Sequence, residues 1–310
     1  MSEIKSVAIA GASGNLGPHV LKALLDAKLH VTVLTRGTKS TTFDPAVKVV
    51  SVDYSSVESL ISALQGQDAV VSAVGMEALE GQTILIDAAI AAGVKRFIPA
   101  DYGAVTTNPK LHEYPFYSTV GKIQKYLAEK SKSTGLSYTV LSTGAFTDML
   151  FGAIGIIDFG KHEAVLYDGG DSRFSTSSMA GVGKAIAQIL KHPKETSNRM
   201  LRISEAILSQ NKLLAIAKEL KPEITWKTTL VDTSEMMKEA LASFGAGDFS
   251  PPVFMKFLGS TVFAGNRFGA AYDVTDTIAC ITCVSATDFS EPHKPSNSRR
   301  GTSPRPLINY

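Results

Sequence analysis

Short runs of apolar residues alternate with amphipathic segments along the first 145 residues of the chain. The runs are nearly all apolar, as expected for strands of a parallel sheet that helices cover on both faces. They predict six strands, at Val7–Ala10, His30–Leu34, Val47–Val52, Ala69–Ala73, Arg96–Pro99 and Tyr138–Leu141. The segments between them predict four helices, at Leu16–Ala27, Val57–Leu64, Gly81–Ala92 and Tyr117–Lys132. This alternation predicts an α/β fold, a Rossmann-type doubly wound parallel sheet.

The regular alternation ends after Gly144, and the rest of the chain mixes strands and helices without an internal repeat. We expect a second, smaller α+β lobe there. Its predicted elements are Phe151–Phe159, a turn at Asp168–Gly170, Val182–Lys191, Met200–Ile203, Asn211–Leu220, Thr225–Leu230, Glu235–Ser243 and Phe254–Phe263. The predicted organisation is a nucleotide-binding domain at 1–150, a substrate-binding lobe at 151–274 that is partly interleaved with it, and a tail at 275–310.

The composition is that of an ordinary globular protein, with 44% hydrophobic and 19% charged residues. Lys and Arg number 31 against 29 Asp and Glu, and the segment from Asp288 onward carries the net charge of +2. The body of the protein is therefore balanced and lacks the basic stripe that nucleic-acid binding requires. No apolar run approaches the roughly 18 residues of a membrane span, so we expect a cytoplasmic protein without membrane contact.

The end of the chain differs in composition from the body. Residues 291–306 are rich in Ser, Pro and Arg and cannot bury enough apolar area to order themselves, so we expect an unstructured tail. The chain has two cysteines, Cys280 and Cys283, in a single Cys-x-x-Cys with one histidine downstream. A structural zinc site takes four ligands, commonly from two such pairs, so no metal site is expected.

Three glycines follow the first predicted strand directly and open the first predicted helix. Gly11 permits the tight turn, Gly14 lets a pyrophosphate approach N–H groups at the positive end of the helix, and Gly17 lets helix and strand pack closely. This position makes the Gly-x-x-Gly-x-x-Gly spacing a strong indication of dinucleotide binding. The residues expected to contact the dinucleotide here are Gly11, Ser13, Gly14, Asn15, Leu16 and Gly17.

Arg36 stands directly after the second predicted strand, where an NAD site carries an acidic residue. Asp or Glu there would accept hydrogen bonds from the adenosine 2′-OH and repel a 2′-phosphate. Arg36, helped by Lys39, instead pairs with that phosphate and stacks on adenine. The sequence therefore predicts NADP(H) as the cofactor, against the alternative that Arg36 only lies solvated in a loop.

Two further strands end in residues that can touch the cofactor. Asp53 closes the third predicted strand, on the adenine side, and Gly75 follows the fourth, on the ribose and nicotinamide side. Both assignments rest on the rule that ligands bind at the carboxyl ends of the strands. For Asp53 an equal alternative is that it caps the helix beginning near Val57.

Together, four segments resemble the NmrA-like and isoflavone reductase-like family of atypical short-chain dehydrogenases, especially its fungal members. They are Gly11–Gly17, Arg36, Arg96–Gly103 and Tyr138–Phe146, within a match that covers roughly residues 4 to 270. The resemblance implies a Rossmann domain, NADP(H) binding and, for many members, reduction of small aromatic or polyketide-like molecules. It also implies cofactor contacts from Ala100, Asp101, Gly144 and Phe146.

The chain departs from this family at its catalytic lysine, which lies three residues after an aromatic residue and seven before a leucine. Alignment on Tyr117 and Leu127 puts Val120 at that position. At about 100° per residue, Lys122 is turned away from the stripe that carries Val120 and Leu127. Three interpretations follow: a local shift of the helix brings Lys122 to the site, Tyr117 or Tyr102 supplies the proton, or the lysine role is lost.

Asp101 and Tyr102, just past the fifth strand, form an acid–phenol pair that can orient a substrate or relay a proton, unless Asp101 only caps the following loop. An apolar substrate between the lobes would be walled by Phe146, Met149, Phe151, Phe254 and Phe257, which can equally be core residues.

Three hypotheses of function remain open. The first is an NADPH-dependent oxidoreductase that acts on a small, largely apolar molecule. The second is an NADP(H)-binding redox sensor that engages a protein partner without turnover, which the missing lysine favours. A third, weaker one is a cofactor-binding enzyme with a non-redox reaction.

Overall fold

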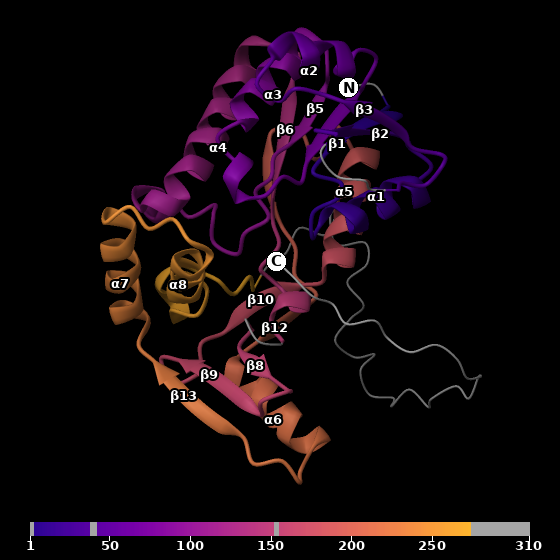
Figure 1. Cartoon of the computed structure of the whole chain (residues 1–310). Coiled ribbons are helices and arrows are strands. Elements are labelled where there is room, and N and C mark those ends of the chain that lie inside the picture. The colour runs from indigo at the N-terminus through magenta and orange to yellow at the C-terminus, as the bar shows by residue number, and fades with distance from the viewer. Residues whose placement is uncertain (1–2, 38–41, 152–154, 274–310) are drawn as a thin grey trace, which may run out of the picture.

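The structure is a computed structural model that describes residues 3–37, 42–151 and 155–273. Lys39, the two cysteines and the predicted tail at 275–310 lie outside the described residues, so the expectations for them stay predictions. Figure 1 shows a larger α/β unit at the top of the molecule and a smaller unit below it. Within the described ranges, no helix is both long and apolar enough to cross a membrane.

A seven-stranded sheet forms the centre of the larger unit, in the order β11-β6-β5-β4-β1-β2-β3, and every neighbouring pair is parallel. Its strands are β1 (Ser6–Ala10), β2 (His30–Thr35), β3 (Lys48–Ser51), β4 (Ala69–Ser72), β5 (Arg96–Ile98), β6 (Ser137–Ser142) and β11 (Arg199–Arg202). The Rossmann-type doubly wound fold and the six predicted strands are thus confirmed. The order reverses between β1 and β4, which places a ligand-binding crevice at the carboxyl ends of these strands.

Helices cover both faces of this sheet because its strands are apolar on both sides. Along β1, Val7 and Ile9 pack into one core while Ala8 and Ala10 pack into the other. The first core is covered by α1 (Gly17–Asp26) and α5 (Met179–Lys191), and the second by α2 (Val57–Leu64), α3 (Gln82–Ala91) and α4 (Pro115–Ser133). The four predicted helices are therefore present, with ends that differ by one or two residues.

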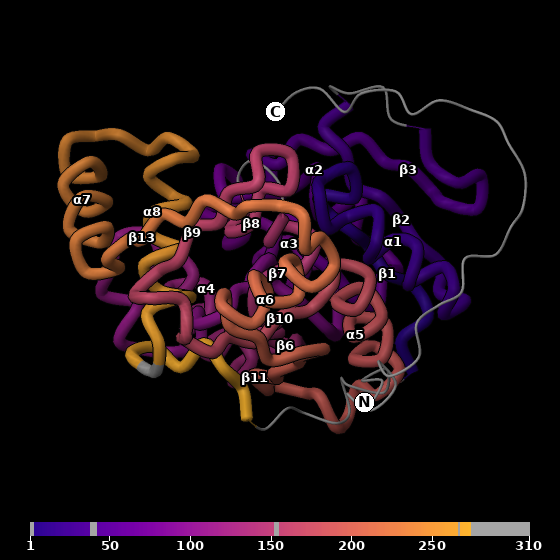
Figure 2. Tube along the Cα trace, turned by 90° about the horizontal axis from the view of Figure 1, so that it is seen from below, coloured from indigo at the N-terminus to yellow at the C-terminus, as the bar shows by residue number. Residues whose placement is uncertain are grey.

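The smaller unit contains two three-stranded sheets, in the orders β12-β10-β7 and β13-β9-β8. Its elements are β7 (Ala145–Phe146), β8 (Ile157–Asp158), β9 (Glu163–Tyr167), β10 (Phe174–Ser177), β12 (Ala206–Leu208), β13 (Lys227–Val231), α6 (Gln210–Leu220), α7 (Thr233–Gly245) and α8 (Pro251–Val262). Phe174, Trp226 and Phe263 belong to its main core. The pair α7 and α8 packs against Phe116 at the start of α4, and Figures 1 and 2 both show this pair beside α4.

Two elements assigned from the sequence to the second lobe lie in the first unit instead. Helix α5 packs on α1, and β11 adds a seventh strand beside β6. Nine residues of α5 are buried, so this helix carries a face wide enough to cover the sheet. The chain therefore passes from the large unit to the small one and back before the small unit is complete.

Arg96 lies fully buried at the start of β5, where its hydrogen bonds connect neighbouring segments of this unit. Its guanidinium donates to Ser137 Oγ at 2.9 Å, to Thr139 Oγ1 at 2.8 Å and to Thr196 Oγ1 at 2.9 Å. Burial lowers its pKa to about 10, so the group stays charged at neutral pH. It thus links β5 to β6 and to the connection between α5 and β11.

We expect Arg96→Met to lower the free energy of unfolding by about 3 kcal/mol, because the variant leaves several buried oxygens without their charged donor. Urea denaturation measures this loss. Lys95→Met is the control, since its ion pair with Asp68 is partly exposed and contributes little. Equal stability of the two variants would contradict the role given to Arg96.

Candidate active site

The glycine turn after β1 has the geometry that a dinucleotide cradle needs. Gly11 has a φ of +82°, and a Cβ added there would lie 2.3 Å from the Ala73 carbonyl oxygen. A Cβ on Gly17 would lie 2.2 Å from the Gly11 carbonyl oxygen. At Gly14, which is exposed, the nearest atom to an added Cβ is the Gly11 carbonyl oxygen at 3.3 Å, so the fold restricts this position far less than Gly11 or Gly17. Its space is open toward solvent, where a ligand can approach the backbone.

The start of α1 is open to an anion. Leu16, at the N-cap, provides no side-chain hydrogen bond to the first N–H groups of the helix. Ser13 and Asn15 are exposed beside these groups, whereas the Leu16 side chain is buried in the core. Of the expected contacts, Leu16 can therefore take part only through its backbone.

Arg36 and Tyr54 lie together beyond the ends of β2 and β3. Arg36 is exposed directly after β2, and the Tyr54 hydroxyl donates to the Leu34 carbonyl at 3.1 Å. Burial raises the pKa of Tyr54 to about 12, and the charge of Arg36 opposes that rise. A guanidinium and a phenol ring thus border the end of β2.

Asp53 does not cap α2, which corrects one of the two alternatives for this residue. The cap is Ser56, whose side chain accepts from the Ser59 N–H. The exposed Asp53 carboxylate accepts from the Ser55 hydroxyl at 2.6 Å and from the Ser55 N–H at 2.8 Å. These bonds lower the pKa of Asp53, so it is ionised at neutral pH.

On the other side of β1, three loops meet at the carboxyl edge of the sheet. Gly75 is exposed and opens the short helix η1 (Met76–Ala78) after β4. The Ala100 N–H, after β5, is buried and already donates to Gln82 Oε1 at 2.7 Å. Gly144, after β6, has a φ of +71°, and a Cβ there would lie 2.3 Å from the Ser175 carbonyl oxygen.

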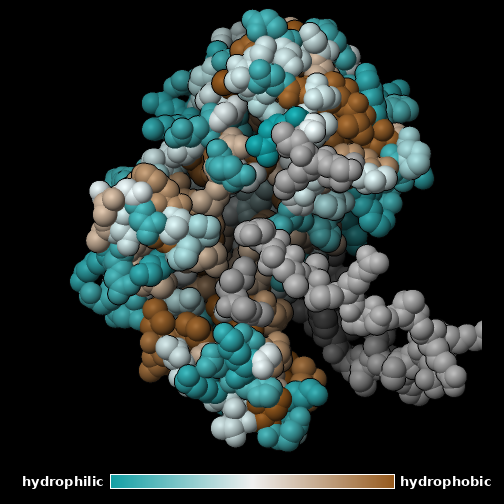
Figure 3. Space-filling model, in the orientation of Figure 1, coloured by the Kyte–Doolittle hydropathy of each residue, from teal (hydrophilic) through white to brown (hydrophobic). Residues whose placement is uncertain are grey.

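The turn at Gly144 brings the small unit against the large sheet. Ala145 and Phe146 form β7 and pair with β10. Phe146, Tyr102 and Met149 all pack at the edge of the core that α1 and α5 cover. The segments after β5 and β6 are therefore adjacent, and the surface is hollowed where the two units meet (Figure 3).

Side-chain hydrogen bonds, one of them made by its own Tyr102, hold the segment of residues 99–108, here called the β5 loop, against neighbouring segments. These are Gln82 on Ala100, Gln124 on Asp101, Tyr102 on Ser72, His112 on Thr106, Thr143 on Tyr102 and Tyr272 on Ala104. The sequence analysis did not identify Gln82, Gln124, His112, Thr143 or Tyr272. Only Gln124 had a visible signal, as a polar residue on the apolar stripe of its helix.

Helix α4 presents Val120, Ile123 and Leu127 to the core and leaves Lys122 and Lys125 exposed. The helix is continuous from Pro115 to Ser133 and shows no local shift that turns Lys122 inward. The geometry therefore gives no support to Lys122 as the residue that replaces the lysine.

The two phenols proposed from the sequence are both engaged. Tyr117 is 1% exposed, and its hydroxyl lies 2.6 Å from Thr261 Oγ1. The Tyr102 hydroxyl donates to the Ser72 carbonyl at 2.8 Å. Burial raises the pKa of both phenols above its usual range. Tyr102 makes no hydrogen bond to Asp101 among the described contacts, so the two are neighbours without acting as a bonded pair.

The residues proposed as walls of a substrate site divide into two groups. Phe257 is fully buried between Phe116 and Phe244, and Phe254 packs on Phe116 with ring centroids 4.4 Å apart. These two are packing residues of the small unit. Phe146 and Met149 are partly buried at the junction of the units, and Phe151 is 39% exposed.

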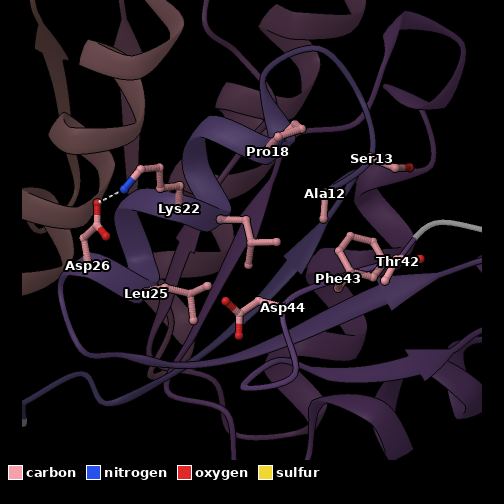
Figure 4. Close-up of a pocket in the computed structure, with 10 residues that line it drawn as sticks. Ala12, Ser13, Pro18, Lys22, Leu25, Asp26, Thr42, Phe43 and Asp44 are labelled. Carbon is pink, nitrogen blue, oxygen red and sulfur yellow. Dashed lines mark hydrogen bonds and ion pairs between the residues drawn. The ribbon is translucent and has the colours of Figure 1, made fainter. Parts of the chain in front are cut away.

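A pocket of about 570 Å³ flanks the glycine turn on the outer side of α1. Figure 4 shows Ser13, Thr42 and Phe43 at one end and the Lys22–Asp26 ion pair, 2.7 Å long, at the other. No residue of the β5 loop or of Gly144–Phe146 lines it. The pocket therefore adjoins the phosphate end of the cradle and is separate from the region around Asp101.

Known proteins resemble this chain in sequence and in fold. The sequence matches the NmrA-like family over residues 3–239. The chain is 34% identical over 259 residues to the oxidoreductase aprR of Aspergillus flavus, a match that covers 81% of this chain and 86% of that protein. The chain belongs to the NmrA-like family, which confirms the resemblance inferred from its motifs.

Two solved structures have the same fold. An isoflavone reductase gives a TM-score of 0.70 at 22% identity, covering 88% of this chain and 91% of the other. The binary complex of leucoanthocyanidin reductase with NADPH, from Vitis vinifera, gives a TM-score of 0.69 at 21% identity, covering 87% and 89%. At these identities the likeness shows the fold alone.

Proposed function

We propose that the protein is an NADPH-dependent oxidoreductase that reduces a small, largely apolar substrate of aromatic or polyketide-like character. The observation that carries this proposal is the glycine cradle at the start of α1 with Arg36 beyond β2. A Cβ would fill the cradle at Gly11 and Gly17, and the exposed Gly14 leaves its mouth open. The residues present fit a dinucleotide with a 2′-phosphate.

The adenosine end of the cofactor would lie over β2 and β3. Arg36 would pair with the 2′-phosphate, which no acidic residue at the end of β2 repels. Asp53 is ionised and exposed after β3, where a carboxylate can accept hydrogen bonds from the adenine amine.

The nicotinamide end would lie over β4, β5 and β6, near Gly75, Ala100, Asp101, Gly144 and Phe146. Bound NADPH supplies a hydride, and the protein supplies position and surroundings. Phe146 and Met149, partly buried at the junction of the two units, would exclude water from the reacting atoms. The relative named an oxidoreductase, and the fold shared with two reductases of aromatic compounds, support this assignment.

The test is rapid mixing of the protein and NADPH with a panel of enones, quinones and isoflavonoids, followed by the loss of NADPH absorbance. We expect oxidation of NADPH by at least one apolar aromatic acceptor and none by small polar aldehydes, because the proposed site is walled by apolar side chains. Oxidation with polar aldehydes alone would contradict the substrate class.

One observation favours a second function, a regulator that binds NADP(H) without turnover. Val120 occupies the position of the family's lysine, and Lys122 lies on the exposed face of α4. A protein that binds NADPH tightly yet oxidises it with no acceptor would support this function and a protein partner for the occupied state.

A further inference from the structure

The buried face of α4 has Val120 at the position of the family's lysine, and it carries a buried polar residue one turn later. Gln124 lies four residues after Val120 and is 4% exposed. Its Nε2 donates to Asp101 Oδ2 at 2.6 Å and to the Thr106 carbonyl at 3.2 Å. In this chain, α4 therefore contacts the β5 loop through the Gln124 amide, which donates a hydrogen bond to the Asp101 carboxyl group.

Asp101 is itself buried, with 4% of its surface exposed, at the carboxyl end of β5. Its second oxygen, Oδ1, accepts no well-aligned hydrogen bond from the described residues, although the Thr106 hydroxyl and the Gly103 N–H lie close enough to the carboxyl to lower its pKa. The titratable groups that face it are His112 from η2 (Pro109–Glu113), Tyr102 from its own loop and Tyr272 from the segment after η4 (Gly265–Arg267).

The balance of these surroundings favours the neutral carboxyl. Burial raises the pKa of Asp101. The Thr106 hydroxyl, the Gln124 amide, the charge of His112 and the Gly103 N–H oppose the rise without cancelling it. A buried carboxyl with one uncommitted oxygen carries its proton there at lower cost than a charge. Among the four groups considered as proton donors, Lys122 is exposed and the hydroxyls of Tyr102 and Tyr117 are engaged.

We propose that Asp101, held in place by Gln124, is the proton donor of the reduction and takes the role that the family's lysine leaves open. The inference rests on the reductase function proposed above. The reduction adds a hydride, supplied by NADPH, to a carbon of the substrate double bond, and the displaced electron pair moves to the substrate oxygen. The O–H bond of the Asp101 carboxyl breaks, its proton goes to that oxygen, and the remaining carboxylate takes a proton from water.

The first measurement does not depend on turnover. Infrared difference spectra of the full chain, wild type against Asp101→Asn, report whether the carboxyl is protonated. We expect the C=O stretching band of a neutral carboxylic acid at neutral pH in the wild type, with and without NADPH. Its absence, with a carboxylate band in its place, overturns the proposal.

The second measurement is the single-turnover rate of NADPH oxidation with an accepted substrate. Asp101→Asn keeps the shape and neutrality of the group but cannot give up a proton in the same way, so we expect the rate to fall about 100-fold or more. NADPH is kept at a saturating concentration for each variant, so that a change in cofactor binding does not enter the measured rate. Asp87→Asn is the matched control, because Asp87 is bonded to Tyr126 and Lys130 away from the sheet edge.

Gln124 acts as a positioning residue, and its variant has a separate signature. The Gln124 amide lowers the pKa of Asp101, so its removal in Gln124→Leu raises that pKa further. The rate falls as pH rises through the pKa of the donor, and we expect this fall to occur at higher pH in Gln124→Leu. An unmoved pH profile overturns the coupling between the two residues.

The outcomes separate the two proposals. A wild type that oxidises NADPH while Asp101→Asn keeps the same rate overturns the donor role alone. A wild type that binds NADPH and oxidises it with no acceptor overturns the reductase function and the donor role with it.

Discussion

Gly14→Val is expected to lower the affinity for NADPH on the order of 1,000-fold while leaving the protein folded. The valine side chain would occupy the open mouth of the cradle and keep a pyrophosphate from the N–H groups at the start of α1. Loss of two charge-assisted hydrogen bonds at about 2 kcal/mol each corresponds to this change. An added Cβ at Gly14 would lie 3.3 Å from the Gly11 carbonyl oxygen, a tight contact that needs a shift of a few tenths of an ångström, so thermal unfolding must accompany the titration.

Calorimetric titration and thermal unfolding together test this prediction. Gly245→Val, at the end of α7, is the matched control because an added Cβ there meets nothing within 4 Å. Gly17→Val serves as a contrast, since its Cβ would lie 2.2 Å from the Gly11 carbonyl oxygen and must disturb the fold. NADPH binding by Gly14→Val at the wild-type affinity would place the cofactor elsewhere.

Arg36→Glu is expected to weaken NADPH binding on the order of 100-fold or more and to leave NADH binding equal or stronger. The change removes the guanidinium partner of the 2′-phosphate, and the new carboxylate repels the phosphate but can accept hydrogen bonds from a ribose 2′-OH. The same titration with both coenzymes measures the effect.

The control for charge alone is Lys125→Glu, on the exposed outer face of α4. This variant makes the same change of net charge at a position far from β2 in the sequence. If Lys125→Glu weakened NADPH binding as much as Arg36→Glu does, the effect would be one of net charge and not of a phosphate contact.

Most of the large sheet was predictable because its central strands are short runs made up mainly of apolar residues. In β1 and β4 burial on both faces confines the polar residues to one serine at one end of each strand, so the apolar run itself marks the strand. The smaller unit gave no such signal. Strand β10, for example, consists of Phe174 followed by three buried polar residues, and β7 has only two residues.

The local sequence pattern did not predict which sheet α5 and β11 join. Both elements were identified as a helix and a strand near their correct positions. Which sheet they join depends on contacts with α1 and β6, which lie far away in the sequence. Local periodicity describes an element and its buried face, and does not say which surface that face meets.

Some features of the candidate site could be predicted from the local sequence, and others could not. The glycine turn and Arg36 are local motifs, so their geometry follows from neighbouring residues. The exposed position of Lys122 and the buried one of Val120 follow from helical periodicity. The bond from Gln124 to Asp101 spans 23 residues, and the contact of Tyr272 with Ala104 spans 168. Such pairs become visible only when the chain is folded.

The central claim is that this chain binds a phosphorylated dinucleotide at the glycine turn. Isothermal titration of the purified wild-type protein with NADPH and with NADH tests it most directly. We expect saturable binding of NADPH, with NADH at least about tenfold weaker, which corresponds to about 1.4 kcal/mol for the 2′-phosphate contact. Absence of binding by either coenzyme would contradict it.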